Sequence, residues 1–351
     1  MKAMIVKEFR ELARDRRTVA MLIAMPLLLL VVFGYAANFN VSSVRVAVVG
    51  PNSVQVSTAA AASSFFDVTS TGVGGDRGDA ERTLRDGDAD MAIVTGSTPS
   101  VLVDGSNLFA AQSVLAHLAQ LNSSPNAASA PLPVAPGPGS IQVLYNPDLK
   151  TSWVMIPAII GLILTFIGTI ITSLGLVRER ETGTIEQLAV MPIKPSAVIV
   201  GKIAPYFVLA ALDMFIVSVL GVVLFDVPFV GNIAVFALGA ALFLFVVLGL
   251  GLFISTISQT AGQAIQAAFF VLLPQILLSG MIFPIAAMAA GVRWISYLLP
   301  LTYFNNIARG VMLRGAPMSS LWLSFAVLAA MAAFAFTAAT LRYRRSLAGE
   351  Q

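Results

Sequence analysis

The sequence predicts an α-helical polytopic membrane protein with six transmembrane helices and a small α/β domain inserted between the first two. Three observations predict this fold. Hydrophobic residues make up 57% of the 351 residues and charged residues only 11%, whereas a soluble domain carries roughly 25% charged residues. Apolar runs recur that exceed the roughly 17 residues a helix needs to cross a bilayer. One stretch, residues 38–150, departs from this composition and carries frequent charges between short apolar runs.

The first 37 residues predict a helix that lies on the membrane, followed by one that crosses it. Residues 1–17 place Phe9, Leu12 and other apolar side chains on one helical face and charges elsewhere, which indicates an interfacial amphipathic helix, or elbow helix. Residues 18–37 are apolar and long enough to be the first span. A cleaved signal peptide is the alternative, but its apolar region is typically about 7–15 residues long.

Residues 38–150 predict the inserted α/β domain, because short apolar runs alternate with helical patterns. The expected strands are 44–49, 65–69, 89–95, 100–103 and 141–145, and the expected helices are 53–62, 79–85 and 107–121. His117 lies in the last of these helices, where we expect an ordinary surface or packing residue. Residues 122–140 are rich in Pro, Ala, Ser and Gly without charge, which is typical of a flexible linker.

Five further apolar runs predict spans two to six. They are residues 153–177, 203–225, 233–255, 261–283 and 321–341. The segment 284–317 is too polar to span and too apolar for a plain loop, which favours a re-entrant or interfacial external hairpin. Its aromatic residues suit a membrane interface, and its candidate residues are Arg293, Trp294, Tyr303, Asn305 and Arg309.

The distribution of Lys and Arg predicts the orientation. With the amino terminus inside, the inner segments hold thirteen of these bases and the outer segments eight, in keeping with the positive-inside rule. Nine acids lie between Asp67 and Asp148 in the inserted domain. We therefore expect both termini, including the tail 342–351, in the cytoplasm and the α/β domain outside. The Ala and Gly content hints at a bacterial genome, hence a bacterial plasma (inner) membrane.

The loop 178–202 is the most charged segment between two spans, with three acids and four bases. Thr184 and Gln187 form a capping-box pattern that starts a short helix, and Pro192 ends it. Such a helix suits docking into a groove of another protein. A charged cytoplasmic loop with no partner is the alternative, and the spacing by itself leaves both open.

The pattern R-E-R-E-x-G-T-x-E-Q-L, followed by Pro192 and then G-K-x-x-P-Y, resembles the first cytoplasmic loop of ABC-2 type exporter permeases. The matching residues are Arg178, Glu179, Arg180, Glu181, Gly183, Thr184, Glu186, Gln187 and Leu188, then Gly201, Lys202, Pro205 and Tyr206. In that family the loop is the coupling helix that contacts the ATP-hydrolysing subunit. The elbow segment and S-G-M-I-F-P after span five are similar to the family too, although Met288-Ala289 stands where the family often has M-P.

The resemblance implies a permease subunit of an ATP-driven exporter that moves a hydrophobic or amphiphilic substrate, such as a drug, lipid or glycolipid, outward across the membrane. It implies an ABC ATP-binding subunit as partner, a second permease subunit in a homodimer or paralogous heterodimer, and contact with membrane lipids. It leaves open a periplasmic or cell-wall adaptor. The chain itself is expected to hold no cofactor, because ATP and Mg would bind the partner ATPase.

Several absences narrow the function classes. Gly201-Lys202 is no P-loop, because Ser196 stands where the first Gly belongs and Ile203 where Ser or Thr belongs. No catalytic motif is visible, so we expect no enzyme, and with no Cys and one His a metal site is not expected. A net charge of +3 spread along the chain does not indicate nucleic-acid binding. The alternatives are a receptor or assembly protein using its external domain, and an ion-driven carrier, which should show several intramembrane charges or an inverted repeat.

Polar residues within the spans are candidates for a translocation path. Asp213 is the one acid deep within a span, and such a carboxylate normally faces a cavity or a partner. The alternative is a protonated or hydrogen-bonded Asp213 with no role in transport. Thr165, Thr169, Gln263 and Gln266 are the other path candidates, with helix packing as their alternative.

Overall fold

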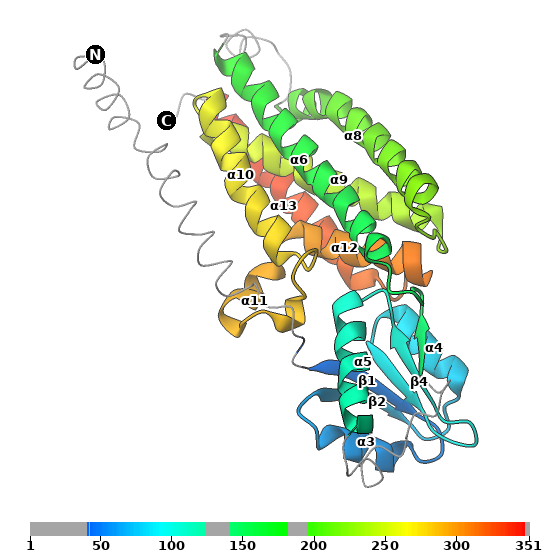
Figure 1. Ribbon diagram of the computed structural model, residues 1–351. Coiled ribbons are helices and arrows are strands. Elements are labelled where there is room, and N and C mark those ends of the chain that lie inside the picture. Colours follow the sequence, from blue (N-terminus) through cyan, green and yellow to red (C-terminus); the bar gives the residue numbers. More distant parts are fainter. Residues whose placement is uncertain (1–40, 42, 124–140, 182–194, 348–351) are drawn as a thin grey trace, which may run out of the picture.

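The computed structural model describes residues 41, 43–123, 141–181 and 195–347. These form a bundle of long helices with an α/β unit at one end (Figure 1). The predicted elbow helix 1–17, the first span 18–37, most of the linker and the short helix of the charged loop lie outside the described residues.

The α/β unit is built on a five-stranded sheet in the order β2-β1-β3-β4-β5. Strand β1 pairs in parallel with β2 and β3, β4 runs antiparallel to β3, and β5 runs parallel to β4. The strands are β1 Val44–Val49, β2 Phe66–Gly72, β3 Met91–Val94, β4 Ser100–Asp104 and β5 Ile141–Leu144.

Helices cover both faces of this sheet, which explains the nearly continuous apolar runs of its central strands. Helices α3 (Ser53–Ala61) and α5 (Leu108–Ser123) pack against the face that carries Val44, Val46 and Val48. Helix α4 (Arg77–Asp86) packs against the face that carries Ala47 and Val49.

Helix α4 begins two positions before the predicted residue 79 because Asp76 and Asp79 form a capping box at its start. It ends at Gly87, whose φ of +83° is the left-handed conformation that glycine adopts readily.

The bundle consists of α6 (Thr151–Glu181), α8 (Pro195–Phe225), α9 (Ile233–Ile257), α10 (Ala261–Leu278) and α13 (Trp322–Leu347). Among the described residues, four helical segments are long and apolar enough to cross a membrane: 151–175, 204–225, 233–257 and 261–278. The described apolar part of α13, Trp322–Ala338, is shorter. The protein is thus a helical membrane protein, with four of the six predicted spans met by these criteria.

The predicted end of span five at residue 283 needs correction. Helix α10 ends at Leu278, because Gly280 adopts a left-handed φ of +78° that an α-helix does not contain. The chain then forms the 3-10 turn η2 (Ile285–Ala287) and the helices α11 (Ala290–Ser296) and α12 (Pro300–Arg309). A π-helical turn, η3 (Gly310–Arg314), follows.

Helix α9 is the centre of the bundle. Helices α6 and α13 pack along it most extensively, and α8 and α10 pack chiefly on α6. Close approach uses small residues, as is common between membrane helices: a Cβ on Gly249 of α9 would lie 2.8 Å from the Cβ of Ala335 in α13. Similarly, a Cβ on Gly251 would lie 2.8 Å from the carbonyl oxygen of Thr169 in α6.

Candidate coupling site

The site begins at the carboxyl-terminal turn of α6, which lies at the end of the bundle away from the α/β unit (Figure 1). The structure places Arg178 and Glu181 in this turn, with both side chains exposed. Helix α6 therefore continues past residue 177, the predicted end of the second span. The sequence contains no helix breaker between residue 177 and Gly183, so nothing local ends the helix earlier. Glu179 and Arg180 of the predicted coupling set belong to the same turn of α6. The remaining members, Gly183, Thr184, Glu186, Gln187 and Leu188, lie outside the described residues.

Glu181 joins the end of α6 to the start of α10. Its Oε1 accepts a hydrogen bond of 2.9 Å from the backbone N–H of Ala261, the first residue of α10. A carboxylate is favoured at this place because the first N–H groups of a helix lack helical partners and the helix dipole is positive there. The contact links the charged loop to span five, and the two residues are 80 positions apart in sequence.

Gln263, a predicted path residue, belongs to the same helix start. Its backbone N–H donates to Oγ1 of Thr260 at 3.3 Å, and its own Oε1 accepts from the backbone N–H of Gln259 at 3.0 Å. Gln263 is buried. These bonds give it a capping role that the sequence pattern T-x-x-Q could have revealed.

The carboxyl-terminal half of α6 and the amino-terminal half of α8 approach closely at a glycine. A Cβ on Gly175 would overlap the hydroxyl oxygen of Tyr206 and lie 3.1 Å from its Cζ. Tyr206 is the last residue of the G-K-x-x-P-Y pattern, and the helix that carries it begins at Pro195. The motif thus places an aromatic side chain against the helix that leads into the charged loop.

The structure does not gather the remaining path candidates at one cavity among the described residues. Thr165 donates to the carbonyl oxygen of Gly161 at 2.7 Å and is fully buried. Thr169 is also buried, against α9. Asp213 on α8 and Gln266 on α10 each keep one buried oxygen, Oδ2 and Oε1, without a hydrogen-bond partner in the described part of the chain.

The carboxyl-terminal end of α10 is held by two residues of α12 that the sequence singled out. The Arg309 guanidinium donates to the carbonyl oxygens of Gly280 at 3.3 Å and Met281 at 3.5 Å, and to that of Val154 in α6 at 3.2 Å. Nδ2 of Asn305 donates to Oγ of Ser279 at 3.3 Å. The carbonyls of Gly280 and Met281 follow the break in α10, where no helical N–H reaches them. Because Arg309 also bonds the Val154 carbonyl, α12 ties α10 to α6.

The other three predicted hairpin residues donate hydrogen bonds to backbone carbonyl oxygens of the hairpin itself. Arg293 donates to the carbonyl oxygens of Ala286 at 2.7 Å and Met288 at 2.9 Å. Trp294 Nε1 donates to the carbonyl oxygen of Gly291 at 2.9 Å, and the Tyr303 hydroxyl donates to that of Tyr297 at 2.7 Å. Short helices leave such carbonyls without partners.

Sequence reasoning missed a buried ion pair between the bundle and the α/β unit. Nη1 of Arg314, the last residue of η3, lies 3.3 Å from Oδ2 of Asp104, the last residue of β4. Their side chains are 9% and 2% exposed. Burial raises the pKa of Asp104, while Arg314 and the N–H of Ser106 oppose that rise. A separation of 210 positions leaves no local sequence signal.

The chain matches known proteins over nearly its whole length. The model of a family described as "ABC-2 family transporter protein" matches residues 16–341. The chain is 28% identical to the probable multidrug ABC transporter permease YbhR of Escherichia coli, over 98% of each chain. It is also 28% identical to the probable multidrug ABC transporter permease YbhS over 90% of this chain and 88% of that one. Over 58% of this chain and 54% of the relative it is 36% identical to the inner membrane transport permease YhhJ.

Proposed function

Because this chain belongs to the ABC-2 transporter family and is a transport permease, we propose that it serves as the membrane subunit of an ATP-driven exporter. The observation that carries the proposal is the family match over residues 16–341, joined to a charged α6 end that is bonded to span five through Glu181. The proposed substrate is hydrophobic or amphiphilic, and the names of the relatives YbhR and YbhS favour a drug.

The proposed topology has six spans, formed by residues 18–37 and helices α6, α8, α9, α10 and α13. Both termini and the loop 178–202 are cytoplasmic, and the α/β unit is extracytoplasmic. The base distribution supports this orientation. So does the position of the α/β unit, which lies at the end of the bundle opposite the turn that carries Arg178 and Glu181 (Figure 1).

The proposed mechanism runs from the charged loop to span five. An ABC ATP-binding subunit, which carries ATP and Mg, docks on the helix Thr184–Leu188 and pushes on it when it closes. Displacement of the α6 end reaches α10 through the Glu181 carboxylate and the Ala261 N–H. At the outer end Arg309 holds α10 to α6. The two helices therefore move as a pair, relative to a second permease subunit.

The test is the coupling of ATP hydrolysis to export in vesicles that contain both subunits. We expect Glu186→Lys and Gly183→Pro to lose export while the complex still inserts into the membrane and the ATPase still turns over, because both changes disrupt the docking helix rather than a span. Glu81→Lys, an exposed change in α4 of the α/β unit, is the matched control and should transport normally.

Full transport by both loop variants would contradict the docking role. Failure of the purified protein to capture any ATP-binding subunit would instead favour a receptor or assembly protein that acts through its α/β unit.

A further inference from the structure

Residues 145–150, here called the joint, connect the last strand of the α/β unit to the first turn of α6. Tyr145 and Leu149 in the joint have positive φ angles of +66° and +49°. Large side chains rarely adopt this left-handed conformation, because it brings Cβ close to a backbone carbonyl oxygen. Such a conformation costs free energy and persists only where the surrounding structure holds it. The joint is therefore a defined structure and not a flexible tether.

The side chain of Asn146 holds the joint from both sides. It has no exposed surface. Its Nδ2 donates to the carbonyl oxygens of Gly105 at 3.3 Å and Lys150 at 3.1 Å, and its Oδ1 accepts from the N–H of Lys150 at 2.9 Å. Gly105 follows β4 in the α/β unit, and Lys150 directly precedes α6. Removing this side chain would leave buried backbone groups without these bonds, which costs free energy.

The apolar cores of the α/β unit and the bundle meet at the joint. Leu149 packs against the bundle cluster that contains Val154 and also against the cluster of the α/β unit that contains Val103. Leu108, the first residue of α5, is 3% exposed and lies in the bundle cluster although its helix belongs to the α/β unit. A change in the angle between the unit and α6 would therefore expose apolar surface, which is unfavourable in water.

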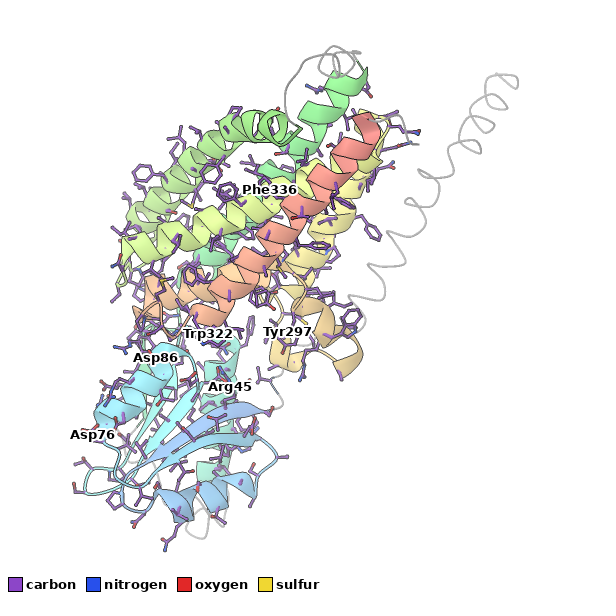
Figure 2. All side chains as sticks on the ribbon, turned by 180° about the vertical axis from the view of Figure 1, so that it is seen from behind. Arg45, Asp76, Asp86, Tyr297, Trp322 and Phe336 are labelled. Atoms are coloured by element: carbon purple, nitrogen blue, oxygen red, sulfur yellow. The ribbon has the colours of Figure 1, made fainter. Side chains whose placement is uncertain are left out.

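A second attachment joins the α/β unit to η3. The buried ion pair of Asp104 with Arg314 links the end of β4 to this turn, and α4 packs on η3 as well. Figure 2 shows that the end of α4 that carries Asp86 faces the bundle, whereas Asp76 at its start lies on the far side. Because η3 follows α12 without a break, this attachment fixes the unit to α12.

Helix α12 is in turn fixed to α6 on both sides of Pro157, where the missing backbone donor would otherwise allow α6 to bend. Before the proline, Arg309 donates to the Val154 carbonyl at 3.2 Å. Beyond it, a Cβ on Gly161 would overlap the ring of Phe304. The α/β unit, α6 and α12 thus contact one another in pairs. Three bodies joined in this way cannot turn freely about any single connection.

We propose that the joint fixes the α/β unit to α6, so that the unit and the amino-terminal half of this helix move as one body. The 31 residues of α6 extend about 46 Å, from the joint to Glu181. One consequence rests on the proposed function: an ATP-binding subunit that displaces the Glu181 end of α6 also turns the α/β unit. Because coupling between two sites is reciprocal, a partner that holds the α/β unit also biases the position of α6.

The distance between two spin labels in one chain tests the joint directly, because the chain has no cysteine of its own. The labels are attached at Ala116→Cys, exposed on α5, and at Ile159→Cys, 39% exposed on α6 beyond Pro157. The full chain is purified and diluted with unlabelled copies, so that only distances within one chain are recorded. We expect one narrow distance distribution.

Asn146→Ala should broaden this distribution at least twofold, because it removes all three bonds of the side chain. Asn52→Ala is the matched control, because Asn52 is exposed in the same unit and its side chain makes no capping bond to α3. If Asn146→Ala lowers the yield, Asn146→Asp keeps the size of the side chain and the acceptor for Lys150. It removes the two donated bonds and should broaden the distribution as well.

A broad or divided distribution in the unchanged chain, or an equal width after the Asn146 substitutions, overturns the proposal. A non-hydrolysable ATP analogue, added to the complex with the ATP-binding subunit, should leave the distance unchanged, and a shift of the distance would contradict movement as one body. If no ATP-binding subunit is captured, the proposed function fails, while the distribution recorded without nucleotide still decides whether the joint is rigid.

Discussion

At the scale of single residues, the Asp104–Arg314 pair is a buried polar contact that joins the α/β unit to the bundle. Both side chains are almost completely buried. A Cβ on Gly87, where α4 ends, would lie 3.0 Å from the Arg314 guanidinium. Removing one partner of a buried ion pair costs more than the pair itself contributes, because the remaining charge stays buried without compensation.

We predict that Arg314→Met destabilises the protein by about 3–5 kcal/mol, the range for breaking buried pairs. The measurement is denaturant unfolding of the purified protein, followed by the fluorescence of its tryptophans. Arg82→Met is the control, because Arg82 also pairs with an aspartate but its side chain is 65% exposed, and an exposed pair contributes little. A similar, small loss for both variants would show that the buried pair does not anchor the unit.

His117 is a second residue of interest, because its protonation should make the stability of the α/β unit depend on pH. Its ring stacks on Phe65 with centroids 4.3 Å apart and lies edge-on to Phe66 at 5.3 Å. Burial lowers the pKa of His117, so the folded state binds its proton less readily than the unfolded chain. The stability contribution of the neutral ring is complete above the ordinary pKa of about 6.5 and is lost as the pH falls through the lowered value.

We therefore predict that the melting temperature of the α/β unit, measured in the whole protein, falls between about pH 7 and pH 5. His117→Phe keeps an aromatic ring for stacking and should flatten that part of the curve. An unchanged pH dependence in the variant would assign the effect to other groups.

At the scale of elements, α10 is held at both ends by groups from distant parts of the chain. Glu181 of α6 bonds its first residue, and Arg309 of α12 bonds the carbonyls just beyond its last. Helix α6 takes part at both ends, through Glu181 and through the Val154 carbonyl. Between α6 and α8, close packing depends on a glycine: Tyr206 of α8 occupies the space that a side chain at position 175 of α6 would need.

We predict that Gly175→Ala destabilises the α6–α8 contact by about 1–3 kcal/mol, the usual cost of overpacking, because the new methyl group overlaps the Tyr206 hydroxyl. Tyr206→Phe in the same chain should recover most of the loss. The measurement is thermal unfolding in detergent, with Gly262→Ala as the control, because no atom lies closer than 3.9 Å to a Cβ there. Equal effects of the two glycine variants would exclude packing against Tyr206 as the cause.

At the scale of the whole molecule, the bundle carries a charged turn at one end and the α/β unit at the other (Figure 1). The proposed exporter requires these ends to lie in different compartments, with the ATP-binding subunit on the side of Glu181. The orientation is therefore the property of the whole chain on which the proposed function depends.

We predict that Val54→Cys, at a position 57% exposed on α3, reacts with a membrane-impermeant maleimide in intact cells. Gln259→Cys, exposed beside the start of α10, should react only after the cells are permeabilised. Because the chain has no cysteine of its own, each variant reports a single site. Labelling in the opposite pattern would reverse the topology and place the charged turn beyond the reach of a cytosolic ATPase.

Local pattern and composition determined much of this protein. Hydropathy located α6, α8, α9 and α10 to within a few residues at most ends, because burial in a bilayer demands long apolar runs. The alternation of strand and helix patterns located the elements of the α/β unit, and the charged loop motif pointed to the family. Arg309 and Asn305 were also visible as polar residues in an apolar segment.

Only the tertiary structure decided which groups meet. The bonds of Glu181 to Ala261 and of Arg314 to Asp104 and the fit of Tyr206 against Gly175 depend on residues far apart in sequence. A hydropathy pattern records how apolar each face of a helix is. It carries no information on which neighbour that face contacts, because every apolar face of a membrane helix is satisfied equally well by lipid or by protein.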